Sequence, residues 1–267
     1  MSTTELEQAE SFNTAIADQV PEIAKPETTT VPLVRGLVNV STGDWQATAE
    51  VRELTGADEE YLARIEAKQN VSYADYMSAL LRRGTVSIGS IQVDKDPSVL
   101  DHLIIGDRDA LFLGIIKATY GPERTFITRC GNCEQKNDIT INLEDDFKYD
   151  VPAVDVRKPI PVTLKNGSVV HLRLPTGADT TQIATKATNS ANQSTMLIAR
   201  CSVWDDATRP ANLEEWARNL SVVDRNTIVR TLSDLNVGPK IGEVNVQCAH
   251  CQESIEIRID WISLLLG

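Results

Sequence analysis

Two short cysteine pairs constrain this chain more than any other feature of its sequence. Cys130 and Cys133 are separated by two residues, as are Cys248 and Cys251, in a chain with 5 cysteines in all. Four thiolates complete the tetrahedral shell of a structural zinc, and a two-residue gap lets both sulfurs of a pair face one ion. Alternating polar and apolar residues flank each pair and predict a hairpin around it. The sequence therefore predicts one four-cysteine zinc site that joins two knuckle hairpins.

The energetics of loop closure favour this zinc site. Holding the two distant pairs together costs about 4–5 kcal/mol of chain entropy, whereas structural zinc binds small peptides with roughly 10–16 kcal/mol. Four protein ligands leave no open position for water or substrate, so the metal is expected to be structural rather than catalytic.

Other uses of the four thiols remain open at this stage. A disulfide within each pair, or a thioredoxin-like redox pair, requires an oxidising compartment or a βαβ setting. An iron–sulfur cluster also uses four cysteines, usually in a denser run, and another thiophilic metal could replace zinc. His250 could also replace a cysteine ligand. Cys201 is expected to be a small buried residue on a helix.

Composition indicates a soluble globular protein with neither a nucleic-acid nor a membrane partner. The 267 residues are 42% hydrophobic and 24% charged, with a formal net charge of −12, whereas phosphate binding draws on clustered lysine and arginine. No segment approaches the ~20 apolar residues of a membrane span. The first residues resemble no secretory signal. We therefore expect assembly in a reducing cytoplasm, where thiols stay available for metal.

The pattern along the chain predicts an α+β fold, with helices and small antiparallel ribbons. Residues 1–32 are polar and are expected to form an extended arm that lies along neighbouring chains, which favours multiple copies in a large assembly. Residues 33–150 and 151–267 are expected to form two α+β halves, each ending in a knuckle hairpin. Helices are expected at roughly 55–65, 73–83, 106–120, 180–204 and 213–235, and hairpins near 31–54, 124–143 and 162–174.

The two halves contain a short repeat. Asp107-Arg108, Gly121-Pro122 and Cys130 occur in the same order as Asp224-Arg225, Gly238-Pro239 and Cys248. Each half is then expected to contain a helix, a Gly-Pro stop, a strand, a knuckle and a strand, in that order. The alternative is that the order is coincidental, because Asp at helix starts and Gly-Pro at helix ends are common. A true repeat predicts two units facing each other across a pseudo-twofold axis, with the ion near it.

No catalytic set of residues emerges, so we expect no enzymatic activity. His171 lies in a predicted strand without a neighbouring nucleophile and is expected to face solvent. Asp107 is interpreted as a helix N-cap, and Asp109 as a favourable charge near the same helix terminus. The glycines near Gly238 lack the Lys-Ser/Thr ending of a phosphate loop.

In combination, these motifs resemble a known protein family, the T-even-type phage baseplate proteins, often called baseplate hub assembly chaperones. The resemblance covers roughly residues 45–260. Its motifs are Val51 to Glu60, Gly106 to Leu111, Thr119-Tyr120-Gly121, the first cysteine pair, Asn166-Gly167, Leu172 to Thr176, Arg200-Cys201 and the second cysteine pair.

The resemblance implies a non-enzymatic structural or assembly protein of a phage tail, in the baseplate or hub. Its expected partners are other tail proteins such as hub, tube or tape-measure proteins, and its expected location is the virion tail after assembly in the host cytoplasm. Two alternatives remain: an assembly chaperone absent from the finished virion, and a zinc-ribbon regulator that binds nucleic acid or polymerase.

Overall fold

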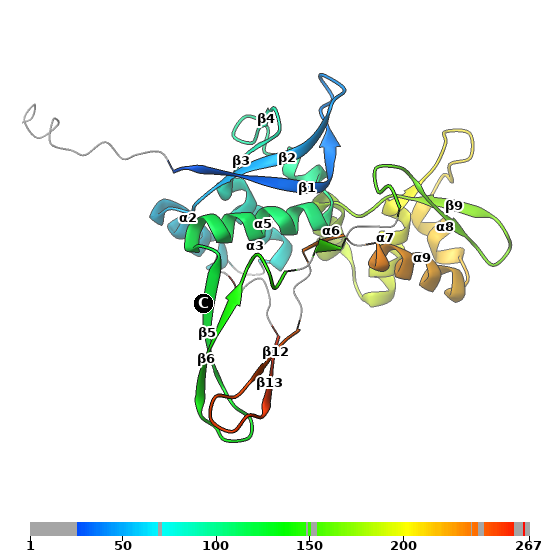
Figure 1. Ribbon diagram of the computed structural model, residues 1–267. Coiled ribbons are helices and arrows are strands. Elements are labelled where there is room, and N and C mark those ends of the chain that lie inside the picture. Colours follow the sequence, from blue (N-terminus) through cyan, green and yellow to red (C-terminus); the bar gives the residue numbers. More distant parts are fainter. Residues whose placement is uncertain are drawn as a thin grey trace, which may run out of the picture.

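The chain has a mixed α+β fold of helices and small antiparallel sheets, as the sequence predicted (Figure 1). The computed structural model describes residues 26–68, 71–147, 149–150, 154–235, 237–239, 243–258 and 264. We call residues 28–142 the N-terminal unit and residues 160–258 the C-terminal unit. The bodies of the units lie side by side, and two long hairpins project together from them as a narrow limb. No helix in these residues is long and apolar enough to cross a membrane.

The N-terminal unit packs helices against a four-stranded sheet with strand order β1-β2-β3-β4. Apolar side chains from sheet and helices form its core, and α5 contributes more of them than any other element because it is buried on nearly every side. The elements are β1 (Thr28–Val38), β2 (Trp45–Arg52), α2 (Gly56–Glu66), α3 (Tyr73–Gly84), β3 (Thr85–Ile88), β4 (Ile91–Gln92), α4 (Val99–His102), α5 (Ile105–Tyr120), β5 (Glu123–Arg129) and β6 (Lys136–Asn142).

The C-terminal unit has the same order of elements, except that its described residues contain no counterpart of β4, and a three-stranded sheet, β10-β9-β8, with a core of its own. Its elements are β8 (Ile160–Thr163), β9 (Val169–Leu172), α6 (Gly177–Lys186), α7 (Ser190–Cys201), β10 (Ser202–Val203), α8 (Leu213–Asn219), α9 (Val222–Asp234), β12 (Glu243–Gln247) and β13 (Ser254–Arg258). In the segment that connects the units, β7 (Tyr149–Asp150) pairs with β11 (Gly238–Pro239) of the C-terminal unit.

Several boundaries differ from those predicted. Residues 28–32, placed in the arm, belong to β1 and pair with β2; residues 1–25 lie outside the described residues. The single helices predicted over 180–204 and 213–235 are each two helices. Asn189 accepts a hydrogen bond from the Asn192 N–H, and Ser221 accepts one from the Asp224 N–H. Each side chain caps a new helix at a point that helical periodicity alone does not reveal.

Asp107 does not cap its own helix, contrary to the sequence interpretation. Its carboxylate accepts hydrogen bonds from the backbone N–H groups of Val34, Arg35 and Gly36, at 2.6, 3.1 and 2.8 Å. The β1–β2 register shifts between Pro32 and Leu37, so these N–H groups lie where the ladder is irregular. A buried carboxylate thus satisfies backbone donors that the sheet leaves without a regular partner.

An arginine–aspartate clamp in the N-terminal unit joins its sheet to two helices. Asp58 is fully buried in the first turn of α2 and accepts hydrogen bonds from Arg52, at the end of β2, and from Arg83, near the end of α3. It also accepts the Thr55 N–H at 2.9 Å, which closes a capping box. Three elements therefore meet at one carboxylate.

The C-terminal unit repeats this clamp. Asp179 in α6 accepts hydrogen bonds from Arg173 at 2.6 Å and from Arg200 at 2.8 Å. It accepts the Thr176 N–H at 2.9 Å, and Arg173 lies 6 residues before its aspartate, as Arg52 does in the first clamp. The shared sequence is Arg-x-x-Thr-Gly-Ala-Asp.

The arginine that follows Asp107 and its counterpart after Asp224 make a second matched set of contacts. Arg108 donates to a hydroxyl 30 residues earlier, on Ser78, and to a carbonyl 8 residues earlier. Arg225 donates to the Thr195 hydroxyl and to a carbonyl at the same two separations. Equal spacings, equal element order and equal partners show that the units are structural repeats of each other.

The bodies of the two units are not related by a twofold axis, which corrects the sequence expectation. Residues 103–105 of the N-terminal unit pair with residues 175–177 of the C-terminal unit, through an isolated bridge between Ile104 and Thr176. A twofold axis would require the equivalent residues, 220–222 and 54–56, to pair as well. Instead Val222 is 72% exposed, and no atom lies within 4 Å of a Cβ built at Gly56. The units are therefore arranged head to tail.

Candidate metal centre

The first knuckle forms the tip of the hairpin between β5 and β6. Cys130 directly follows β5 and donates its N–H to the Gln135 carbonyl at 3.0 Å, while its own carbonyl accepts the Glu134 N–H at 2.9 Å. Glu134 has φ 58°, a left-handed conformation that is uncommon for residues other than glycine. The tight turn brings Cys133 back toward Cys130.

The second knuckle, between β12 and β13, repeats this backbone geometry. Cys248 donates its N–H to the Glu253 carbonyl at 2.8 Å and accepts the Gln252 N–H at 3.0 Å. Gln252 has φ 62° at the position equivalent to Glu134. The same local turn therefore presents the second pair of sulfurs.

The four sulfur atoms of the two knuckles form one cluster. The sulfurs of Cys130, Cys133, Cys248 and Cys251 all lie within 4.8 Å of one another. Two short separations join the two hairpins: Cys130 to Cys251 at 3.6 Å and Cys133 to Cys248 at 3.6 Å. This cross-pairing is reciprocal, so the knuckles face each other symmetrically although the bodies of the units do not.

The geometry of the cluster fits a tetrahedral metal ion. A Zn–S distance of about 2.3 Å in tetrahedral geometry places neighbouring sulfurs about 3.8 Å apart. The observed 3.6 Å is close to this spacing and much longer than the ~2.0 Å of a disulfide bond. No histidine belongs to the cluster: His250 is exposed, and its backbone N–H donates to the Cys248 sulfur at 3.4 Å.

Two asparagines of the first knuckle hairpin fix the second one in place. The Asn137 side chain is buried, and its oxygen accepts the Ala249 N–H at 2.9 Å. The Asn132 amide lies 3.7 Å from the Cys251 sulfur and donates to it. Polar side chains around the sulfurs are what orients the ligands of a metal site.

The electrostatics of the cluster favour a bound cation. Burial opposes ionisation of Cys248, but the N–H groups of Cys251 and His250, with the Cys133 thiol, lower its pKa to about 6. At Cys133 the Gln135 N–H lowers the pKa, whereas burial and the three neighbouring thiols outweigh it and raise the value to about 12. Four thiolates this close repel one another, and a thiophilic cation removes that repulsion by binding the deprotonated sulfurs.

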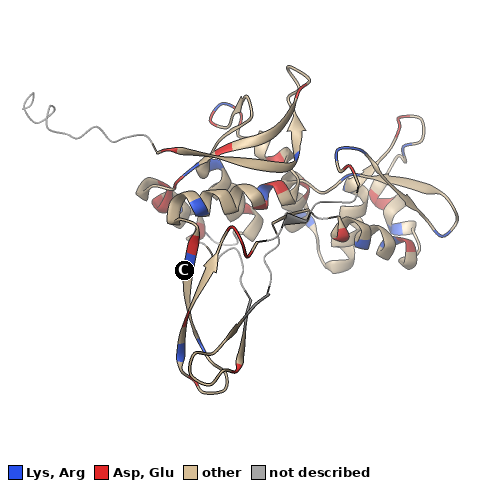
Figure 2. Cartoon of the chain, viewed as in Figure 1, with Lys and Arg blue, Asp and Glu red and all other residues tan. Residues whose placement is uncertain are grey.

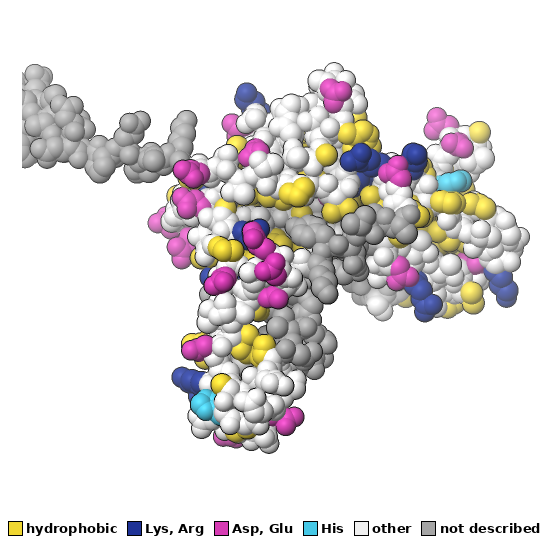
Figure 3. Space-filling view, viewed as in Figure 1, with side chains coloured by type: hydrophobic (Ala, Val, Ile, Leu, Met, Phe, Trp, Pro, Cys, Tyr) yellow, Lys and Arg dark blue, Asp and Glu magenta, His cyan; other side chains and the backbone are white. Residues whose placement is uncertain are grey.

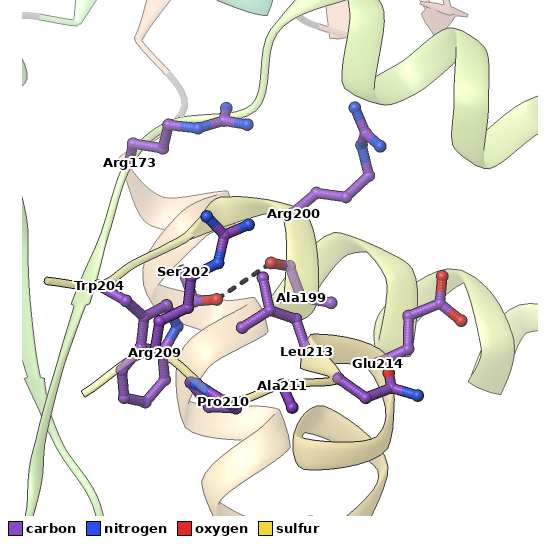
Figure 4. Close-up of a pocket in the computed structure, with 11 residues that line it drawn as sticks. Arg173, Ala199, Arg200, Ser202, Trp204, Arg209, Pro210, Ala211, Leu213 and Glu214 are labelled. Atoms are coloured by element: carbon purple, nitrogen blue, oxygen red, sulfur yellow. Dashed lines mark hydrogen bonds between the residues drawn. The ribbon is translucent and has the colours of Figure 1, made fainter. Parts of the chain in front are cut away.

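A hollow of about 770 Å³ lies in the C-terminal unit beside Trp204 (Figure 4). Two of its arginines, Arg173 and Arg200, are held by Asp179, and the Ser202 hydroxyl donates to a backbone carbonyl at 3.0 Å. The residues lining this hollow therefore include no hydroxyl paired with a general base. His171 is exposed on β9, as predicted.

Sequence reasoning missed the residues that support the centre and the clamps. Asn137 gave no signal, because its partner lies 112 residues away. The two arginine–aspartate clamps did give one, because Arg-x-x-Thr-Gly-Ala-Asp occurs at both Arg52 and Arg173.

Comparison with known proteins gives one match. The model of the family described as T4 bacteriophage base plate protein matches residues 38–263, a span that includes the C-terminal unit, the N-terminal unit from residue 38 onward, both clamps and all four cysteines of the cluster. Among curated proteins and among solved structures, none matches the chain significantly. Because the match covers most of the sequence, the chain belongs to the T4 bacteriophage base plate protein family.

Proposed function

We propose that this chain is a non-enzymatic structural protein of a phage tail, in the baseplate or hub, whose two units are clamped by one structural zinc ion. Cys130, Cys133, Cys248 and Cys251 are the proposed ligands. The observation that carries the proposal is that sulfurs from two hairpins of different units lie within 4.8 Å of one another.

The position of the cluster supports a mechanical role. The turns that carry the four cysteines form the far end of the limb, away from the bodies of both units (Figure 1). Only a small apolar group around Ile255 and Val246 accompanies them. A metal ion there replaces the core that two thin hairpins are too small to build.

The arrangement also suits binding of other tail proteins. Family membership implies association with such proteins, and we propose hub, tube or tape-measure proteins as partners and the virion tail as the location. The limb and the bodies present separate surfaces (Figure 3). A division near residue 150 into two halves agrees with the two separate cores.

Metal analysis of the purified protein tests the clamp. Mass spectrometry of protein purified without added metal is expected to find about one zinc ion per chain, with the four thiols of the cluster protected from alkylation until a chelator removes the metal. If the analysis finds iron instead of zinc, the identity of the metal changes but the four-cysteine site stands. Stoichiometric loss of metal without any change in thiol accessibility would contradict the site.

Quantitative mass spectrometry of purified virions tests the role. Retention of the chain in finished particles is expected for a structural part. If the chain is abundant during infection but absent from virions, it acts as an assembly chaperone. Recovery from infected cells with nucleic acid and without tail proteins would favour the regulator alternative.

A further inference from the structure

The contact between the two units uses two different faces. Face A consists of residues 103–108 in the N-terminal unit. Face B consists of residues 175–178 and 237–239 in the C-terminal unit. Backbone hydrogen bonds join them, from Ile105 N–H to the Pro175 carbonyl at 3.2 Å and from Gly177 N–H to the Leu103 carbonyl at 3.0 Å.

Three glycines allow this close approach. A Cβ at Gly106 would overlap the Val237 carbonyl, and a Cβ at Gly238 would lie 2.6 Å from the Gly106 Cα. A Cβ at Gly177 would lie 2.6 Å from Nη1 of the buried Arg108. The interface is therefore a tight backbone contact, specific in position and direction.

Because the units are repeats, each also has the face that the other uses. Face A of the C-terminal unit is residues 220–225, and face B of the N-terminal unit is residues 54–57 and 120–122. Both are open: Val222 and Val223 are 72% and 60% exposed, and among the described residues no atom beyond the local chain lies within 4 Å of a Cβ at Gly56 or Gly121. The two unused faces lie at opposite ends of the molecule, beside α9 and α2 (Figure 1).

We propose that these unused faces bind each other between copies, so that face A of one C-terminal unit docks on face B of the next copy's N-terminal unit. The occupant of each face is thus a second copy of this chain. The contact continues an interface that already exists inside the molecule, and a heterologous contact of this kind builds rings or open chains of copies.

The shape of the open face B fits the exposed valines. It carries a hollow of about 440 Å³ whose lining includes Leu54, Leu62, Tyr76 and Tyr120. Val223 stands where the N-terminal unit has Gly106, and its side chain excludes an identical backbone contact. Instead, the apolar hollow offers space for that side chain, and burying it is worth about 1.5–3 kcal/mol.

Charge around this hollow sets the design of a test. Glu59 and Glu66 line it, and red acidic stretches are visible on α2 (Figure 2). A carboxylate introduced at Val223 would therefore meet like charges as well as lose apolar contact.

The experiment is sedimentation velocity on the full, metal-loaded chain over a range of concentrations. The unaltered chain is expected to form larger species as concentration rises. Val223→Glu blocks face A and Gly56→Trp blocks face B, so each is expected to weaken self-association at least tenfold. An equimolar mixture of the two is expected to form dimers, because each variant keeps one functional face.

Val40→Glu is the matched control, since Val40 is 97% exposed in a loop outside both faces; it is expected to associate normally. Unchanged melting temperatures show that the variants fold. An unaltered chain that stays monomeric throughout would overturn the proposal, as would a mixture that fails to form dimers. Association lost only after removal of residues 1–25 would assign the contact to the arm instead. The metal content of the protein is measured separately, so failure of self-association and failure of metal binding can be told apart.

Discussion

Asp58 and Asp179 occupy equivalent positions in the two units, and each carboxylate holds two guanidinium groups from different elements. The relative exposure of their side chains is 0% and 1%, whereas that of the four arginines ranges from 21% to 39%. In each ion pair the carboxylate is thus buried, whereas the guanidinium groups stay partly exposed. Each unit therefore contains the same arrangement, in which a single acid fixes a strand end, a helix start and a helix end.

Replacing either aspartate is expected to destabilise the protein strongly. Asp58→Asn or Asp179→Asn leaves two arginines facing a neutral amide, and breaking a buried ion pair in this way costs about 3–5 kcal/mol. Chemical denaturation measures the loss. Glu214→Gln is the control, because its ion pair with Arg218 is exposed and is worth less than about 1 kcal/mol. Equal effects of all three substitutions would contradict the clamp.

The same carboxylates predict how stability depends on pH. At both residues burial alone would raise the pKa, but hydrogen bonds from the arginines and backbone outweigh it and lower the pKa of Asp58 and Asp179. A depressed folded pKa contributes stability above the unfolded value of about 3.9, and this is lost as pH falls below it. Denaturation midpoints measured from pH 6 to pH 2 should therefore fall most steeply below about pH 4. Asp58→Asn should flatten that slope.

Loss of one metal ligand is expected to reduce metal content and stability together. Cys130→Ser or Cys248→Ser should remove about 3 kcal/mol or more, since structural zinc contributes most of the folding energy of small metal modules. Thermal unfolding should shift by about 2–4 °C per kcal/mol in a chain of this size. Cys201→Ala is the control, because Cys201 is fully buried in the core of the C-terminal unit, away from the cluster. This variant should lose stability and keep its metal. Full zinc retention in both serine variants would argue against the four-thiolate site.

The head-to-tail contact predicts different outcomes at two equivalent glycines. Gly177→Ala places a methyl group against Arg108 and should destabilise the contact between the units, by about 1–3 kcal/mol for overpacking. Gly56→Ala, at the same position of the other unit, meets open space and should be neutral or stabilise α2 by up to about 1 kcal/mol. Unfolding free energies of the two variants provide the comparison. Similar values would mean that the interface tolerates a side chain.

The sequence by itself determined the four-cysteine cluster, the α+β class and most helices and strands. The reason is that these features depend on local patterns: a two-residue cysteine spacing, an alternating strand or a helical stripe requires only neighbouring residues. The order of Asp107, Gly121 and Cys130 likewise predicted the repeat, although the arginine–aspartate motif would have indicated it more directly.

Only the tertiary structure decided how the repeats are placed and what Asp107 does. Asp107 bonds to N–H groups more than 70 residues away, and no local pattern specifies such a partner. The head-to-tail arrangement depends on steric fit. A Cβ would clash at Gly106 and at Gly177, whereas the counterpart of Gly106 is a valine, Val223, and a Cβ at Gly56 would meet open space. Such packing is a property of two surfaces in contact, and it is decided by long-range sterics that a linear pattern does not encode.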